Sequence, residues 1–298
     1  MVKPLIFDHP SLENFRRRAF LQLKPGADFL LRAVGDDLSE RLLALSRHFD
    51  VALDLHGHTG IGAEILRRWG RVKMIERAET STLYKKRRQE HDGEDVFHVM
   101  GREALSLRSH SYDLILSLLS LHITHDIAGA FAKIRAALKP DGLFLGVLLG
   151  AGTLQELRET LLEADLASTG GGYPRVYPFA DMRDIAALLQ RAGFAMPVVD
   201  VETITVRYDN LYDLMADLRA QGMQNALTER SRRPVSRRFF KKAAEIYATR
   251  FSDVDGRIRA RFSFVWFSGW APDPSQQKPM KPGSAQMSLA EALEKNQI

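Results

Sequence analysis

The chain has 298 residues, of which 45% are hydrophobic and 27% are charged, a composition typical of one large or two small soluble globular domains. It has no cysteine, which excludes disulfides, thiolate catalysis and cysteine-ligated zinc. The net charge of +5, from 42 basic and 37 acidic residues, is too small to indicate nucleic-acid binding. No apolar run approaches the ~20 residues of a membrane span, and no secretory signal begins the chain, so we expect a cytoplasmic protein.

The first half of the chain predicts helices followed by alternating strands and helices. Apolar residues recur every three or four positions over 11–49, which predicts helix. Continuous apolar runs, separated by helical segments, predict strands at 51–55, 72–76, 95–100, 112–122 (in its first part) and 142–150. This alternation predicts βαβ units and a parallel sheet. Because the runs are unbroken rather than alternating, we expect helices on both faces of that sheet.

The second half adds helices at 153–166 and 181–194 and a strand at 197–208. A helical stretch follows, and 258–270 predicts a last strand. The remainder, 271–298, is rich in Pro, Gln and Ser and predicts an irregular tail. We therefore expect a single domain at 1–270, with its core sheet at 50–150 and a helical insertion at 209–257.

The segment "ALDLHGHTGIGAEIL" (52–66) resembles a nucleotide-binding turn. In doubly wound sheets, ligands lie over the carboxyl ends of the strands, and an acid about 20 residues after the turn binds ribose hydroxyls. Asp54 ends the first predicted strand and Glu76 ends the second. The turn alone is a weak signal, but the turn, the acid and five alternating strands together predict a cofactor site at this edge.

This arrangement resembles the class I S-adenosylmethionine-dependent methyltransferases, whose first loop is Asp/Glu-x-Gly-x-Gly-x-Gly and whose second strand ends in an acid. The "KPDG" of 139–142 is also typical of that family. The resemblance implies a Rossmann-like α/β fold with a seven-stranded, mostly parallel sheet and helices on both faces. It also implies cofactor contacts from Asp54, His56, Gly57, His58, Gly60, Glu76, Gly101, Arg102 and Ser117.

A longer resemblance, to the methyltransferase-like assembly factors of respiratory complex I, runs nearly from end to end. Its specific segments include "SLLSLH" (117–122), "GAGTLQELR" (150–158), "LYDLMADLRAQGMQNAL" (211–227) and "KPGSAQMSLAEAL" (281–293). The resemblance implies an enzyme that modifies a protein side chain, since the mitochondrial member is an arginine hydroxylase acting on a complex I subunit. Because the match begins at residue 6, we expect a bacterial homologue without a mitochondrial leader.

Two departures from the methyltransferase pattern predict weak or absent S-adenosylmethionine binding. His56 and His58 occupy positions where the family has glycine, which permits positive φ and close approach of the backbone to the ligand. Gly101 occupies the position of the acid that contacts the adenine amino group. The role of Asp54 stays open between orienting the turn and satisfying backbone donors.

Several histidines follow the first and fourth predicted strands, which are neighbours in a sheet of this family. Two histidines and one carboxylate suit non-haem iron oxygenases, but histidines at loop edges are more often solvated or hydrogen-bonded to the backbone. We therefore expect no metal site, and the residues considered for one are His56, His58, His122, His125, Asp126 and Glu76. We assign no catalytic residue; the nearby candidates for a general base are Glu103, His122 and His125.

Three further segments are open between a binding role and a structural one. Gly150–Thr153 with Arg158 lines a substrate pocket or begins a helix. The aromatic residues of the glycine-rich loop at 170–179 cover a bound peptide or anchor the loop. The basic segment "ERSRRPVSRRFFKK" (229–242) is a docking surface for an acidic partner or phosphate, or a solvated helix end. Three functions follow as alternatives: a protein-modifying enzyme, an ordinary methyltransferase, or a non-catalytic protein that binds a partner.

Overall fold

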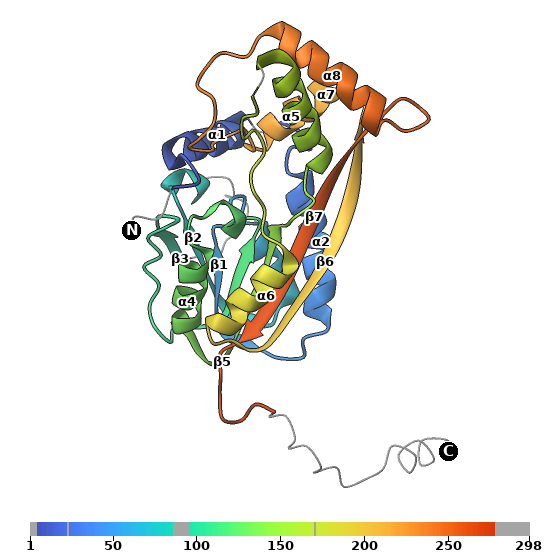
Figure 1. The fold of residues 1–298 in the computed structure, drawn as a ribbon. Helices are drawn as coiled ribbons and strands as arrows, with labels where there is room; N and C mark the ends of the chain where they lie inside the picture. The colour runs from blue at the N-terminus through green and yellow to red at the C-terminus, as the bar shows by residue number, and fades with distance from the viewer. Residues whose placement is uncertain (1–4, 23, 86–95, 170, 278–298) are drawn as a thin grey trace, which may run out of the picture.

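The computed structural model describes residues 5–22, 24–85, 96–169 and 171–277. Seven strands form one sheet with the order β3-β2-β1-β4-β5-β7-β6, drawn in Figure 1. All neighbouring pairs are parallel except β5–β7 and β6–β7. The strands are β1 (Phe49–Leu55), β2 (Val72–Glu79), β3 (Val96–Val99), β4 (Tyr112–Leu118), β5 (Leu138–Leu149), β6 (Ala195–Tyr208) and β7 (Ile258–Trp270).

Eight α-helices and two short 3-10 helices accompany the sheet in the described part of the chain. The α-helices are α1 (His9–Gln22), α2 (Phe29–Leu43), α3 (Ile61–Trp69), α4 (Ile127–Ala137), α5 (Gln155–Thr169), α6 (Met182–Arg191), α7 (Leu211–Ala220) and α8 (Arg237–Phe251). The 3-10 helices are η1 (Thr82–Lys85) and η2 (Leu121–Ile123).

Each face of the sheet has its own hydrophobic core. Residues of α2, α3, α5, α7 and α8 pack in one cluster with the sheet, which includes Leu38 and Trp266. Residues of α4 and α6 pack in a second cluster, which includes Phe131 and Phe144. Continuous apolar strands are stable here because both of their faces exclude water.

This architecture confirms the predicted class I methyltransferase fold, with the helices α7 and α8 inserted between β6 and β7. One difference lies before the sheet, where 11–49 forms two helices and the beginning of β1 rather than one helical region. Pro25 and Gly26 separate α1 from α2; Gly26 adopts φ +75°, and proline cannot continue a hydrogen-bonded helix. Residues 271–277 have no helix or strand, and 278–298 lie outside the described residues.

The helices α1, α5, α7 and α8 gather at one end of the molecule, as Figure 1 shows. Gly222, just after α7, allows close contact with α1, because a Cβ built on it would lie 2.9 Å from the Cα of Arg16. Asp8, at the start of the chain, pairs with Arg230 at 2.8 Å. These contacts hold α1 over the carboxyl edge of the sheet. Among the described residues, no helix is long and apolar enough to cross a membrane.

Candidate functional site

The turn after β1 is built around the carboxylate of Asp54. The backbone N–H of Ala63 donates to Asp54 Oδ2 at 3.2 Å, and a Cβ built on Gly57 would lie 2.3 Å from Asp54 Oδ1. Only glycine fits above this carboxylate at position 57. Asp54 therefore accepts a hydrogen bond from a backbone N–H of the turn. This is one of the two roles expected for it, the satisfaction of backbone donors.

His56 adopts a glycine-like backbone, with φ +55°, and its side chain is almost completely buried. Its Nε2 donates to the carbonyl oxygen of Met100 at 3.1 Å, because a carbonyl can only accept. Burial lowers the pKa of His56 to about 3, so the ring is neutral at physiological pH. The imidazole thus bridges the ends of β1 and β3.

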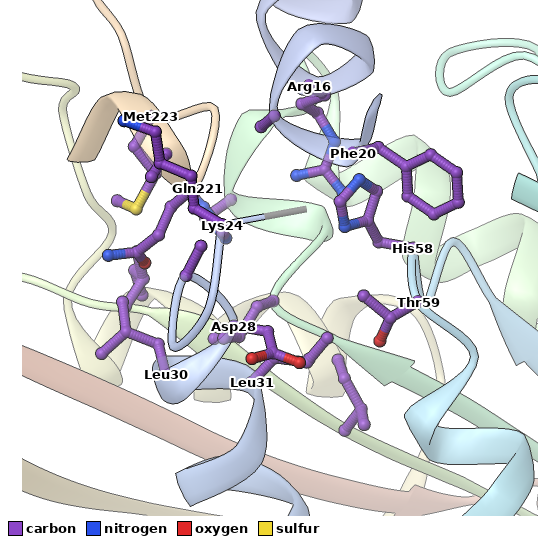
Figure 2. A pocket seen from close by; sticks show the side chains of 17 residues that line it. Arg16, Phe20, Lys24, Asp28, Leu30, Leu31, His58, Thr59, Gln221 and Met223 are labelled. Atoms are coloured by element: carbon purple, nitrogen blue, oxygen red, sulfur yellow. The ribbon is translucent and has the colours of Figure 1, made fainter. Parts of the chain in front are cut away.

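His58 also adopts positive φ, at +56°, and its ring lies among aromatic side chains. The ring centroids of Phe20 and Tyr84 lie 5.5 and 4.9 Å from that of His58, and 4.9 Å from each other. Figure 2 shows the Phe20 side chain, from α1, beside His58. The three rings fill the space between α1, the turn and η1.

Glu76 does not end the second strand, which continues to Glu79, so the expectation for its position is wrong. Three of the four residues over 76–79 are charged, which hid the strand's true end. The Glu76 carboxylate accepts hydrogen bonds from His98 at 2.7 Å, Arg108 at 2.6 Å and Tyr112 at 3.2 Å. These partners satisfy its oxygens within the protein.

Arg77 and Glu79 also lie at this edge of the sheet, and the sequence patterns did not single them out. Both side chains are buried. Arg77 lies 3.9 Å from Asp54 and 3.9 Å from Glu79, and beneath Gly60, whose Cβ would lie 2.7 Å from the guanidinium carbon. Burial raises the pKa of Glu79 to about 7. The sequence contained one signal for them. Arg77 and Glu79 are two positions apart, which places both side chains on the same face of a strand.

The end of β3 is closed by α1 rather than open to a ligand. Gly101 is exposed, and Arg102 is buried. Arg102 forms an ion pair with Glu13 of α1 at 3.1 Å, and Glu13 also accepts from Thr80 at 2.8 Å. Ser117, at the end of β4, is fully buried, and its hydroxyl hydrogen-bonds that of Ser120 at 2.9 Å.

A cavity of about 100 Å³ remains beside the turn, between the sheet and the helices α1, α2 and α7. Figure 2 shows Arg16, His58 and Asp28 around it. Small-molecule sites usually occupy about 300–1,000 Å³, so this cavity is small. Its lining includes Arg16, Lys24, Asp28, His58, Thr59, His122, Gln221 and Met223, with apolar residues from α1, α2, β4 and β5.

Most of the residues expected to contact S-adenosylmethionine lie outside this cavity. Of the nine residues that the resemblance assigned to the cofactor, only His58 lines the cavity. A ribose needs hydrogen-bond acceptors at the end of the second strand. The acid at that end is Glu79, whose buried carboxylate lies 3.9 Å from Arg77. The imidazoles of His56 and His58 fill the space that glycines leave open.

The four histidines do not converge on one point. His58 and His122 line the cavity, and burial lowers the pKa of His122 to about 3. His125 lies instead with His9 and Glu103, whose ligand atoms come within 4.8 Å of one another. Asp126 accepts from the backbone N–H of Gly129 and caps α4.

The side chains of His9, Glu103 and His125 take part in hydrogen bonds. His125 Nδ1 accepts from the backbone N–H of Ile6 at 3.1 Å, so in the neutral ring the proton is on Nε2. Metal-ligating histidines instead donate from the nitrogen that does not bind the metal. His9 pairs with Glu103 at 2.9 Å. The set forms a hydrogen-bonded contact between α1 and the loop before α4.

A second hollow, of about 420 Å³, lies after β5 and is lined by Gly152, Thr153, Arg158 and Phe179 among others. Thr153 does not cap α5; its hydroxyl donates to the Ser263 carbonyl at 3.2 Å. Tyr177 is buried, and its hydroxyl donates to the carbonyl of Gln224 at 2.5 Å. Tyr177 therefore anchors the loop, whereas Tyr173 is exposed.

Residues 53–146 match a family model described as a methyltransferase domain. The chain is 33% identical to the zebrafish (Danio rerio) protein named "Arginine-hydroxylase NDUFAF5, mitochondrial", over 89% of this chain and 82% of the relative. The human protein of the same name is 32% identical, over 96% of this chain and 83% of the relative. The chain belongs to the methyltransferase-fold family that includes these arginine hydroxylases. It is also 31% identical to the malonyl-[acyl-carrier protein] O-methyltransferase of Nitrosospira multiformis, over 90% of this chain and 92% of the relative.

Solved structures share the fold of this chain. The YcgJ protein of Bacillus subtilis aligns over 79% of this chain and 98% of its own, with a TM-score of 0.56 and 14% identity. An S-adenosylmethionine-dependent methyltransferase of Thermotoga maritima aligns over 88% of this chain and 99% of its own, with a TM-score of 0.50 and 14% identity. At this identity, the similarity supports the architecture alone.

Proposed function

We propose that this chain binds a protein partner in the assembly of respiratory complex I, and that it does so without S-adenosylmethionine. The observation that carries the second part is the filled carboxyl edge of the sheet. His56 bonds to Met100, Arg77 lies under Gly60, and α1 closes the end of β3 through Glu13. The first part rests on similarity to the arginine-hydroxylase relatives over more than four fifths of their length.

The proposed binding of a partner does not depend on cofactor chemistry. The helices α1, α5, α7 and α8 gather beside the sheet, and the segment most specific to the complex I factors, 211–227, forms α7 and the turn after it. A protein partner recognised there needs no cofactor in the turn after β1. We expect the chain to act in the cytoplasm of a bacterium, on a subunit before its membrane assembly.

Deletion of the gene tests this proposal. We expect less assembled complex I on native gels, restored by the wild-type chain. Mass spectrometry of the subunits then distinguishes the roles: restoration without a new methyl group supports binding without methyl transfer. Restoration accompanied by methylation that depends on this chain would contradict it, as would normal complex I in the deleted strain. An oxygen atom gained at a subunit arginine would make the chain a hydroxylase, as its relatives are named.

A second candidate function is methyl transfer to a carboxylate. The observations favouring it are the similarity to the O-methyltransferase over 92% of that relative and the two cations, Arg16 and Lys24, that line the cavity. These cations attract an anionic group and repel a guanidinium. Incubation with malonyl-acyl carrier protein and radiolabelled S-adenosylmethionine tests it, with base-labile label on the carrier protein as the positive result.

A further inference from the structure

The segment 229–242 carries seven basic residues and one acid, and it forms the loop before α8 and the first half of that helix. Its exposed cations are Arg232, Arg233, Arg237, Arg238, Lys241 and Lys242. Arg232 approaches Asp8 at 3.3 Å. The other five form no ion pair with any residue in the described part of the chain. This surface has the charge to bind an anionic partner.

The stability of α8 does not explain these cations. A helix N-terminus carries partial positive charge and is stabilised by acids. The first turn of α8 contains no acid and begins with Arg237 and Arg238. The only favourable cap is Ser236, which accepts from the backbone N–H of Phe239 at 3.2 Å. Because the cations oppose the helix dipole, the stability of α8 gives no reason for their presence.

Exposed apolar side chains lie on α5, which packs against α8, and on the loop after α5. Leu162 and Leu166 on α5 are 46% and 55% exposed, and Tyr173 is 36% exposed. Leu162 lies next to the loop that carries Tyr173, because a Cβ built on Gly172 would lie 2.5 Å from its Cδ1. The helices α5 and α8 pack together at one end of the molecule.

A chain of contacts joins the apolar side chains to the first turn of α8. The buried Asp165 accepts from the backbone N–H of Tyr173 at 3.4 Å and from Arg175 at 2.6 Å. The guanidinium carbon of Arg175 lies 4.5 Å from the centroid of Phe239. These contacts place the apolar and basic groups on neighbouring elements that pack together. The two groups are here called the α5–α8 surface, consisting of Leu162, Leu166, Tyr173 and the six exposed cations.

We infer that the α5–α8 surface binds an acidic protein segment that presents apolar side chains. Protein interfaces combine an apolar centre with a polar rim and favour arginine and tyrosine. Nucleic acid would use the cations through its phosphates but leave the two leucines exposed. A second copy paired by a two-fold axis would bring like charges together. The inference rests on the proposed function only because the partner is a protein.

Fluorescence anisotropy tests this inference with the full chain. The probe is a labelled peptide of about 20 residues with glutamate and leucine at helical spacing. We expect binding that weakens with salt, and at least about tenfold weaker binding when glutamine replaces glutamate. The variant R237E/R238E/K241E/K242E should lose at least about tenfold in affinity, and L162S/L166S about fivefold. The matched control, R183E/R191E on α6, should bind as the wild type does.

Absence of peptide binding, or binding unaffected by charge reversal on α8, would overturn the inference. Tighter binding of oligo-dT, or of vesicles containing phosphatidylserine, would overturn it in favour of another class of partner. Self-association lost in the charge-reversed variant would instead assign the surface to a second copy. None of these outcomes bears on the proposal that the chain acts without S-adenosylmethionine. Titration with S-adenosylmethionine tests that proposal separately.

Discussion

The guanidinium carbon of Arg77 lies 2.7 Å from the point where a Cβ on Gly60 would stand. Gly60 adopts φ +78° and precedes the first residue of α3. The turn after β1 therefore packs directly against the buried Arg77 side chain of β2. Asp54 and Glu79 flank the same guanidinium at 3.9 Å. The buried side chains of Arg77, Asp54 and Glu79 thus lie together beneath the turn.

Replacement of Gly60 by alanine should destabilise the protein by about 2–4 kcal/mol, because strain from positive φ adds to a clash with a buried guanidinium. Gly70 is the control, since it ends α3 with φ +73° and has no atom within 4 Å of its Cβ position. We expect Gly70→Ala to lower the free energy of unfolding by only about 1 kcal/mol. Equal losses in urea denaturation would show that Arg77 does not pack against the turn.

Replacement of Glu79 by glutamine should change how stability depends on pH. Burial raises the pKa of Glu79 from 4.5 to about 7, so the native state holds its proton more tightly than the unfolded chain. Stability from this group is complete below pH 4.5 and is lost as pH rises through 7. Relative to Glu79→Gln, we expect the wild type to lose on the order of 2 kcal/mol between pH 5 and 8. The same change at the exposed Glu40 is the control, and parallel pH profiles of wild type and Glu79→Gln would contradict this role.

Replacement of Arg237 by glutamate should stabilise α8 by about 0.3–1 kcal/mol, because an acid in the first turn complements the helix dipole. Arg250, in the last turn, gives the opposite expectation. It pairs with Glu159 at 2.8 Å and Glu163 at 2.9 Å, so Arg250→Glu should lower the melting temperature. If thermal unfolding showed a loss of stability for Arg237→Glu, the cations of α8 would have a structural role within the fold.

Replacement of Tyr177 by phenylalanine should destabilise the protein by about 1–3 kcal/mol, since buried groups lose their partner. The Tyr177 hydroxyl donates to the Gln224 carbonyl at 2.5 Å and accepts from the backbone N–H of Ala226 at 3.3 Å. Tyr173→Phe, on the same loop but exposed, should have little effect. Chemical denaturation of the two variants compares these positions directly, and similar values would refute the anchoring role of Tyr177.

The centre of the sheet was predictable because its strands β1, β4 and β5 contain mainly apolar runs between helices, as "VALDL" of β1 illustrates. The insertion of α7 and α8 was predicted from the helical stretch between the last two predicted strands, and the neighbouring positions of β1 and β4 came from the family resemblance. The end of β2 was not predictable, because charged residues over 76–79 normally indicate a surface. Their burial depends on partners from β1, β3 and the loop before β4, which no local pattern reveals.

The positions of the histidines in the site were predictable only in part. His56 and His58 stand where the methyltransferase pattern has glycine, which marked them as unusual. Both adopt the positive φ that glycine favours. The direction of each imidazole depends on distant residues, Met100 for His56 and Phe20 with Tyr84 for His58. The contact of His125 with His9 depends on how α1 packs across the sheet edge, 116 residues away in the chain.

The central claim, that side chains of this protein fill the position of the cofactor, is tested most directly by isothermal titration of the wild-type chain with S-adenosylmethionine. We predict no saturable heat up to about millimolar ligand, equivalent to a binding free energy weaker than about −4 kcal/mol, and no shift in melting temperature. A micromolar dissociation constant, with a thermal shift that rises with ligand concentration, would contradict the account.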